Sequence, residues 1–154
     1  MIGHITKTKN RPYKRSFKYS SFYGSAYHWT HVLRHPDKEK RELIAKGMEL
    51  AIEQKKWIRY SNGNKSVSLF DALKVKFKIK SLHKRVYANC CNLVSVCCRY
   101  AGLNTPRKCD SRTVPKTFKG FTRIKYKNGM KLKRGDILVS TTMPKCHTAV
   151  YLGD

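Results

Sequence analysis

Cys90 and His147 have the residue types, spacing and surroundings needed for nucleophilic attack on an amide. Cys90 stands where a predicted helix begins, so its thiol would lie at the positive end of the helix dipole. A thiol attacks as the thiolate, and a helix N-terminus beside an imidazole lowers a thiol pKa. The unpaired N–H groups of the first helical turn can also hold a developing oxyanion. His147 opens a predicted strand after a loop, where its ring can face the helix start and act as the base.

The elements that must position these two residues follow from the apolar pattern. Apolar side chains keep a helical stripe over residues 90–101, and Gly102 is a natural C-terminal stop. The segments 136–140 and 147–152 are typical of two strands of one sheet, and 121–126 alternates as a further strand. The nucleophile helix is therefore expected to precede and pack on an antiparallel sheet.

Further helices are predicted upstream. The pattern after Pro36-Asp37 indicates an amphipathic helix to about residue 53, and residues 66–75 indicate a short second helix after the turn at 62–64. Helices that come first and strands that follow predict the α+β class.

Two stretches resemble one known family. The run NCCNLVSVCCRYAG from Asn89 resembles the nucleophile helix of NlpC-like peptidoglycan hydrolases, usually Asp-Cys-Ser-Gly/Ser-Phe/Leu-Val before a helix that ends in Ala-Gly. The run LKRGDIL from Leu132 resembles the Gly-Asp-Ile/Leu strand of that family, and HTAVYLGD from His147 resembles its His-x-Ala/Gly-Ile/Val-Tyr-Leu-Gly strand. The resemblance covers residues 89–154, with a looser likeness of the helix before Tyr60 to the N-terminal helices of phage lysins.

This resemblance implies a papain-like fold and a phage-lysin type of activity. The implied reaction is hydrolysis of an amide in the stem peptide of the bacterial cell wall, or of the bond that joins this peptide to muramic acid. Cys90 maps onto the family nucleophile and His147 onto its base, while Tyr60 corresponds to an aromatic residue that lines the active site. No cofactor is needed for this chemistry.

The sequence departs from the family at several positions. Asn89 stands where the family has Asp, and Cys91 and Asn92 stand at its small Ser and Gly positions. The residue that orients the catalytic His lies in the family on a strand beyond the Tyr-Leu-Gly run, whereas this sequence ends at Asp154. Either another residue orients His147, or the domain is incomplete at its C-terminus with part of the sheet missing; we expect the second.

The remaining cysteines and histidines have simpler interpretations. Cys91 is the rival nucleophile, and Cys97 and Cys98 suit core packing. The cysteine spacing disfavours a zinc site, because no two cysteines have Cys-x2–4-Cys spacing. Reduced thiols are expected, and Asp136 is expected at a turn or strand start. The other histidines are read as surface or packing residues: His4, His28, His31, His35 and His83.

Charge and length set the domain organisation. With 34 Lys and Arg against 9 Asp and Glu, the formal net charge of the 154-residue chain is +25. We expect a flexible basic arm at residues 1–20 and a single amidohydrolase domain at 21–154. No signal peptide or membrane-spanning run is recognised, so synthesis in the cytoplasm and arrival at the wall by another route are expected.

The positive field predicts polyanionic partners. Peptidoglycan with anionic wall polymers is the first expected partner, without membrane insertion, and oligomeric state is left open. One alternative is a basic nucleic-acid-binding protein with structural cysteines, although no helix-turn-helix, zinc-finger or RNA-binding aromatic signature is present. Another is a relative without activity that only binds wall fragments.

Overall fold

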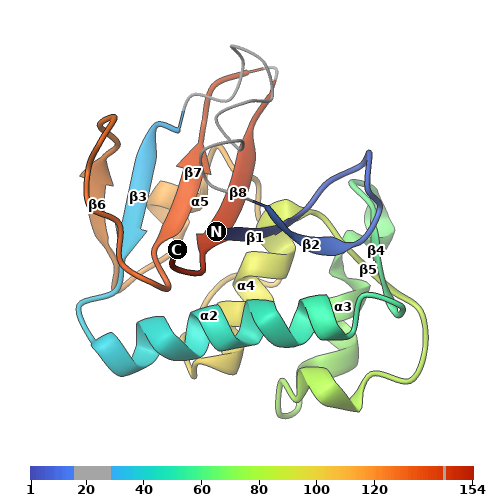
Figure 1. The fold of residues 1–154 in the computed structure, drawn as a ribbon. Helices are drawn as coiled ribbons and strands as arrows, with labels where there is room; N and C mark the ends of the chain where they lie inside the picture. Colours follow the sequence, from blue (N-terminus) through green and yellow to red (C-terminus); the bar gives the residue numbers. More distant parts are fainter. Residues whose placement is uncertain (16–28, 144) are drawn as a thin grey trace.

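The computed structural model describes residues 1–15, 29–143 and 145–154, and its centre is an antiparallel sheet of six strands in the order β2-β1-β8-β7-β3-β6 (Figure 1). These strands are β1 (Ile2–Ile5), β2 (Pro12–Arg15), β3 (His31–Arg34), β6 (Thr122–Lys125), β7 (Ile137–Ser140) and β8 (His147–Tyr151). A separate two-stranded parallel sheet consists of β4 (Ile58–Tyr60) and β5 (Val86–Ala88). The α+β class with an antiparallel sheet is confirmed.

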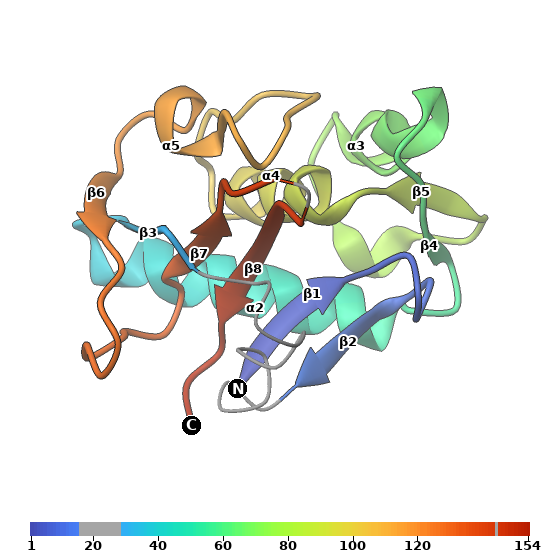
Figure 2. The same ribbon diagram turned by 90° about the horizontal axis from the view of Figure 1, so that it is seen from above.

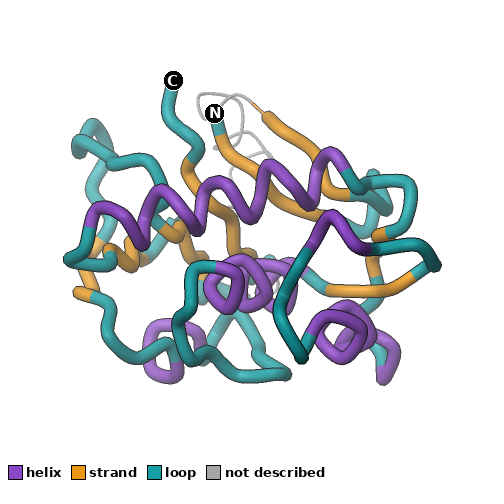
Figure 3. Tube along the Cα trace, turned by 90° about the horizontal axis from the view of Figure 1, so that it is seen from below, coloured by secondary structure: helices purple, strands orange, loops and turns teal. Residues whose placement is uncertain are grey.

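Two longer helices pack together on one face of the sheet. The helices are α2 (Lys38–Glu53), α3 (Ser68–Leu73), α4 (Cys90–Tyr100) and α5 (Val114–Thr117), with short 3-10 turns η2 (Asn64–Val67) and η3 (Ile79–Ser81). Figure 2 shows α2 running across the sheet, and Figure 3 shows α4 beside it when seen from below. Both α2 and α4 contact β1 and β8, two neighbouring inner strands of the sheet.

The sequence explains why α2 begins and packs where it does. Asp37 has an extended backbone and caps the helix, accepting hydrogen bonds from the backbone N–H of Glu39 at 2.8 Å and of Lys40 at 3.4 Å. Gly47 lets α2 approach α4 closely, because a Cβ there would lie 3.2 Å from the Cα of Cys97. The predicted amphipathic helix is therefore confirmed, and its buried face lies on the nucleophile helix.

Apolar side chains are buried on both faces of the sheet. The larger cluster lies between the sheet and the helices and includes Leu33, Met48 and Leu93. A smaller cluster on the opposite face includes Ile2 and Leu138. Burial on both faces holds the central strands rigidly, which suits a site built at their ends.

A buried ion pair fixes the strand ends near the C-terminal motif. Asp136 is fully buried and accepts from Arg34 through Nε at 2.9 Å and Nη2 at 2.6 Å, in a two-point pairing. Its second oxygen also accepts from the backbone N–H of Lys133 at 2.8 Å. Asp136 thus joins β3 to the start of β7, as expected for a residue at a strand start.

The N-terminal segment differs from the flexible arm expected for residues 1–20. Its described part forms β1 and β2, and Ile2 and Ile5 are fully buried. β1 pairs with β8 in the register Ile2↔Tyr151, so the two ends of the described chain lie side by side (Figure 1). The apolar residues of β1 outweigh the basic composition of the segment. The expected boundary between residues 20 and 21 lies outside the described residues.

The sheet edge beside β8 also differs from expectation. Missing strands were expected to leave this edge uncovered, but β1 pairs with it. The predicted strand near residues 121–126 is present as β6, and it pairs with β3 at the far edge of the sheet. Over the described ranges no helix is long and apolar enough to cross a membrane.

Candidate active site

Cys90 is the first residue of α4, as the sequence predicted. Asn89 caps this helix: its backbone is extended, and its side-chain oxygen accepts from the N–H of Asn92 at 2.8 Å. β5 leads directly into the cap, and its pairing with β4 sets Tyr60 opposite Ala88. The thiol therefore sits at a helix N-terminus beside an aromatic side chain from another strand.

His147 is the first residue of β8 and is brought to the thiol. Its side chain is buried, and its backbone pairs with Ser140 of β7. The charge of the His147 imidazole and a side-chain hydrogen bond from it both lower the pKa of Cys90. The two residues singled out in the sequence thus lie together, 57 positions apart, at the junction of α4 and the sheet.

A second imidazole lies directly behind His147. The Nδ1 atom of His4 lies 2.8 Å from the Nε2 atom of His147, in a buried hydrogen bond between β1 and β8. Because Nε2 of His147 faces His4, its Nδ1 is the ring nitrogen left for Cys90. His4 also packs on Tyr13, with ring centroids 4.4 Å apart. The ring direction of His147 is therefore fixed from the side opposite the thiol.

His4 has the protonation state that this arrangement requires. Burial first, and then the charges of His147 and Arg15, lower the pKa of His4 to about 2. A neutral His4 with its proton on Nε2 presents Nδ1 as an acceptor, so it can receive the N–H of His147. His4 would stay an acceptor when His147 becomes an imidazolium.

His4 was expected to be a surface or packing residue, and the structure shows that it is buried and packed. Its side chain is 1% exposed and contacts the candidate base. His31, His35 and His83 are partly or fully exposed and do not line the pockets at Cys90. His28 lies outside the described residues. The available signal was the short run Ile2-Gly-His-Ile5, in which a polar ring is placed among apolar residues.

The Cys90 thiol is not acidified as the helix-start argument predicted. A hydrogen bond with Cys91, followed by burial, raises the pKa of Cys90 to about 12, and these effects outweigh the lowering by His147. The thiol is only 9% exposed, so water solvates its anion poorly. The resting site therefore holds a neutral thiol that must lose its proton to a base as it reacts.

Cys91 contacts Cys90, but the thiol of Cys91 is directed into the 109 loop. Its thiol donates to the carbonyl oxygen of Cys109 at 2.8 Å and to the Asn89 side-chain oxygen at 3.2 Å, and it is almost fully buried. Cys97 and Cys98 are fully buried in the core on α4, as predicted. All six cysteines are free thiols. Within the described parts of the chain, no three His, Cys, Asp or Glu side chains are placed to share a metal ion.

Two pockets meet at Cys90. The larger has a volume of about 530 Å³ and lies between the start of α4 and the 108–113 loop. The second, of about 290 Å³, lies against the turn after β1 and includes His147. Tyr60, Cys90 and Cys146 line both. A substrate chain can therefore pass over the thiol with one part in each pocket.

Comparison with protein families decides the assignment. A sequence profile described as the endolysin-like domain (ELLD) matches residues 15–154. The chain belongs to the endolysin-like domain family. This membership indicates a lytic enzyme of phage-lysin type that acts on the cell wall. No curated protein and no solved structure matched at the significance required. Cys90 and His147 of this endolysin-like domain lie inside the matched range, and His4 precedes it.

Two further polar residues of the endolysin-like domain, Ser111 and Asn92, hold the loop beside Cys90. Ser111 lies 3.4 Å from the Cys90 sulfur, and its hydroxyl bonds to Thr148 at 2.7 Å. Asn92 holds the same loop, because its side-chain oxygen accepts from the N–H of Cys109 at 2.9 Å. Ser111 lies in a loop without a periodic signal, so only the fold reveals its contact with Cys90.

Proposed function

We propose that this endolysin-like domain is an NlpC-like, papain-like cysteine amidase or endopeptidase that hydrolyses an amide of the peptidoglycan stem peptide. The observation that carries the proposal is the line of Cys90, His147 and His4 across the start of α4, β8 and β1. A cysteine at a helix start, an imidazole on the adjacent strand and a third group behind that imidazole are the parts of this catalytic machinery.

Each residue has one task in the proposed reaction. The Cys90 sulfur attacks the amide carbon while its proton passes to Nδ1 of His147. The oxyanion faces the unpaired N–H groups of the first turn of α4. His147 then gives the proton to the leaving nitrogen, the C–N bond breaks, and an amine and a Cys90 thioester remain. His147 next takes a proton from water, whose oxygen attacks the thioester carbon. The C–S bond then breaks, the acid is released, and His147 returns the proton to the sulfur of Cys90.

His4 supports the base through both half-reactions. When His147 holds two protons, its Nε2–H donates to the neutral Nδ1 of His4, which fixes the ring toward Cys90. In the related family, the third residue comes from a strand beyond the Tyr-Leu-Gly run. In this chain β1 pairs with β8, so the proposed orienting residue comes from the N-terminal end of the sequence.

The proposed partners and location follow from charge and family. The surface with a net charge of +25 would hold the protein on anionic wall polymers, and the reaction uses no cofactor. The protein would be made in the cytoplasm and reach the wall by a separate release route.

Digestion of purified cell walls tests the proposal. We expect Cys90→Ala and His147→Ala to stop the release of new amino groups, located by mass spectrometry of the soluble fragments. Cys91→Ser is the matched control for the rival thiol and should still release amino groups, because a serine hydroxyl can keep the hydrogen bond to the carbonyl oxygen of Cys109. Full clearance by Cys90→Ala would exclude the mechanism, and a wild-type protein that binds walls without cleaving them would indicate the inactive wall-binding alternative.

A further inference from the structure

Another hollow, separate from the two pockets at Cys90, lies between α5 and β6. It has a volume of about 350 Å³, and we call it the β6 pocket. Its lining consists of Pro115, Lys116, Phe118, Lys119, Gly120, Phe121 and Arg123. Three of these side chains are cationic, none is acidic, and all three cations are exposed. The pocket is thus a concave cationic site outside the proposed catalytic machinery.

The positive charge of the β6 pocket is not neutralised by the protein. Other arginines are paired with acids, such as Arg107 with Asp71 at 2.7 Å and Arg112 with Asp110 at 2.7 Å. Among the residues that the structure describes, Lys116, Lys119 and Arg123 form no such ion pair. Their charges are therefore available for a ligand from solution.

The pocket has local features that hold its charges in place. The Lys119 ammonium donates to the carbonyl oxygen of Lys116 at 3.0 Å, which ties the two lysine positions together. Arg123 lies on β6, the edge strand that pairs with β3. Its charge adds to burial in lowering the pKa of His31 on β3, so its field reaches across the strand pair. Three cations around one hollow favour a small dianionic or chain-borne monoanionic group.

We propose that the β6 pocket binds a phosphate group of the polyol-phosphate polymers of the bacterial wall. The inference adds a binding site to the endolysin-like domain and does not depend on the chemistry at Cys90. α5 separates the two sites: Thr113 just before it lines the large catalytic pocket, and Pro115 within it lines the β6 pocket. A polymer held at the β6 pocket would keep the catalytic pocket close to the wall surface.

The aromatic residues of the pocket argue against nucleic acid as the ligand. Binding of single strands uses exposed aromatic faces on which bases stack. Phe118 is only 3% exposed, and the ring of Phe121 already packs on His35 and Phe118, with centroids 5.4 and 6.2 Å away. The hollow therefore offers cations for a phosphate without a stacking platform for a base.

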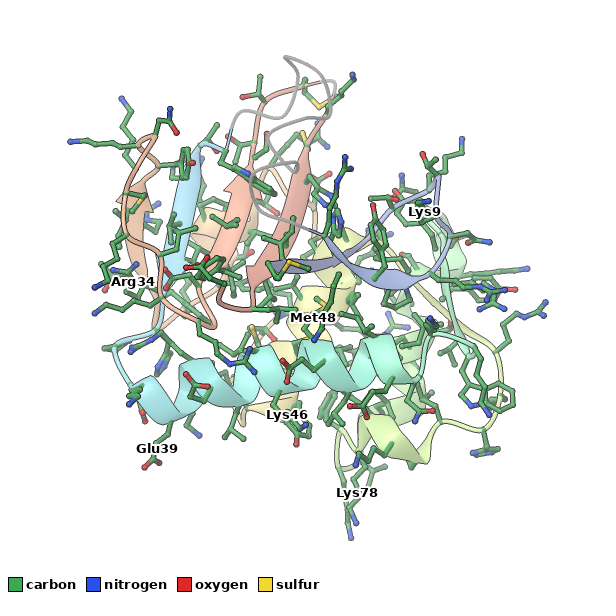
Figure 4. The ribbon with its side chains drawn as sticks, viewed as in Figure 1. Lys9, Arg34, Glu39, Lys46, Met48 and Lys78 are labelled. Atoms are coloured by element: carbon green, nitrogen blue, oxygen red, sulfur yellow. The ribbon has the colours of Figure 1, made fainter. Side chains whose placement is uncertain are left out.

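A charge-matched pair of variants tests the proposal. The site variant carries Lys116→Gln, Lys119→Gln and Arg123→Gln. The control variant carries Lys46→Gln, Lys78→Gln and Lys80→Gln, which removes the same charge from exposed positions away from the pocket. Figure 4 shows Lys46 and Lys78 pointing away from the sheet. Binding to a synthetic glycerol-phosphate oligomer is measured by calorimetry at low and moderate salt, with duplex DNA as the second probe.

We expect the site variant to bind the glycerol-phosphate oligomer about tenfold more weakly than the control, as three partly screened contacts would give. Equal weakening by both variants would show that net charge alone is responsible and would overturn the proposal. A loss of DNA binding in the site variant without a loss of glycerol-phosphate binding would also overturn the proposal. Alkylation of Cys90 is measured in both variants and should be unchanged. An inactive Cys90 would refute the proposed hydrolysis without affecting this binding result.

Discussion

His4 on β1 and His147 on β8 share a buried hydrogen bond with a length of 2.8 Å although 143 positions separate them in the sequence. The pairing of the two strands makes this contact, and Gly3, beside His4, is opposite Val150 in the register. Orientation of the candidate base thus depends on a residue far from every motif that surrounds it.

Replacement of His4 tests its role as a positioning residue. We expect His4→Ala to lower wall hydrolysis about 10²-fold or more, since a base without a fixed ring direction loses much of its contribution. His4→Asn can place an amide oxygen near the position of Nδ1 and should recover part of the rate. Initial rates across pH, together with melting temperatures, separate the two effects.

If His4 has a purely structural role, a different result is expected. The activity of both variants would then follow their melting temperatures, and the pH profile would keep its shape. Equal activity of the Ala and Asn variants at equal stability would exclude positioning by His4.

Stability should fall in mild acid because of His4. Its pKa is lowered from 6.5 to about 2 in the folded protein, so below pH 6.5 the unfolded chain binds a proton that the native state does not. The free energy of unfolding therefore has its full value above this pH. It declines by about 1 kcal/mol per pH unit as the pH falls below it. Urea titrations between about pH 7 and pH 5 measure the slope. His4→Asn should flatten it, and an unchanged slope would contradict the assignment.

Removal of the Cys91 sulfur should make Cys90 more reactive. The hydrogen bond with Cys91 is the largest cause that raises the pKa of Cys90. In Cys91→Ala the pKa should fall, and the thiolate fraction at a fixed neutral pH grows about tenfold for each pKa unit. Alkylation rates at Cys90, located by mass spectrometry, give the measurement. Both proteins carry Cys146→Ser, because Cys146 lines the same pockets and would compete for the reagent.

The buried pair of Arg34 and Asp136 should contribute to the stability of the fold and not to the reaction. Asp136→Asn leaves the Arg34 charge partly buried without its partner, and the free energy of unfolding should fall by about 3 kcal/mol. The double variant Arg34→Leu with Asp136→Leu removes both charges and should be less destabilised than the single change. Denaturant titration measures both. A loss of activity that exceeds the loss of folded protein would show a role in the reaction.

Gly135 should tolerate no side chain. Its φ is +83°, and a Cβ atom would lie 2.0 Å from the carbonyl oxygen of Arg41 on α2. Gly135→Ala should therefore lose about 3 kcal/mol or more of stability, from backbone strain and a collision with main chain. Gly129→Ala is the control, because Gly129 has a similar φ of +78° with open space around it. Equal melting temperatures for the two variants would contradict the collision.

The parts predicted well from sequence have strong local signals. The prediction of α4 was correct because Asn89 caps the helix, an apolar stripe runs through it and Gly102 follows it with a φ of +77°. The helix after Asp37 was correct for similar reasons. The strands β7 and β8 were recognised from continuous apolar runs with turn residues before them. The positions of Cys90 and His147 at the starts of α4 and β8 were predicted because each residue lies at such a boundary.

The parts that sequence did not predict depend on contacts between distant segments. Strands β1 to β5 have only three or four residues each, too few for a periodic pattern. The role of His4 appears only when β1 joins β8. The high pKa of Cys90 arises from Cys91 and from burial, and burial of a single thiol is not visible in a run of letters.

The placement of β1 between β2 and β8 also sets when the proposed site can assemble. Gly3 and His4 are synthesised well before their sheet neighbour, which ends at Tyr151. A ribosome adds about 5–20 residues per second, so the first strand has to wait several seconds for its partner. Until residue 151 has emerged, a nascent chain has Cys90 without a placed base.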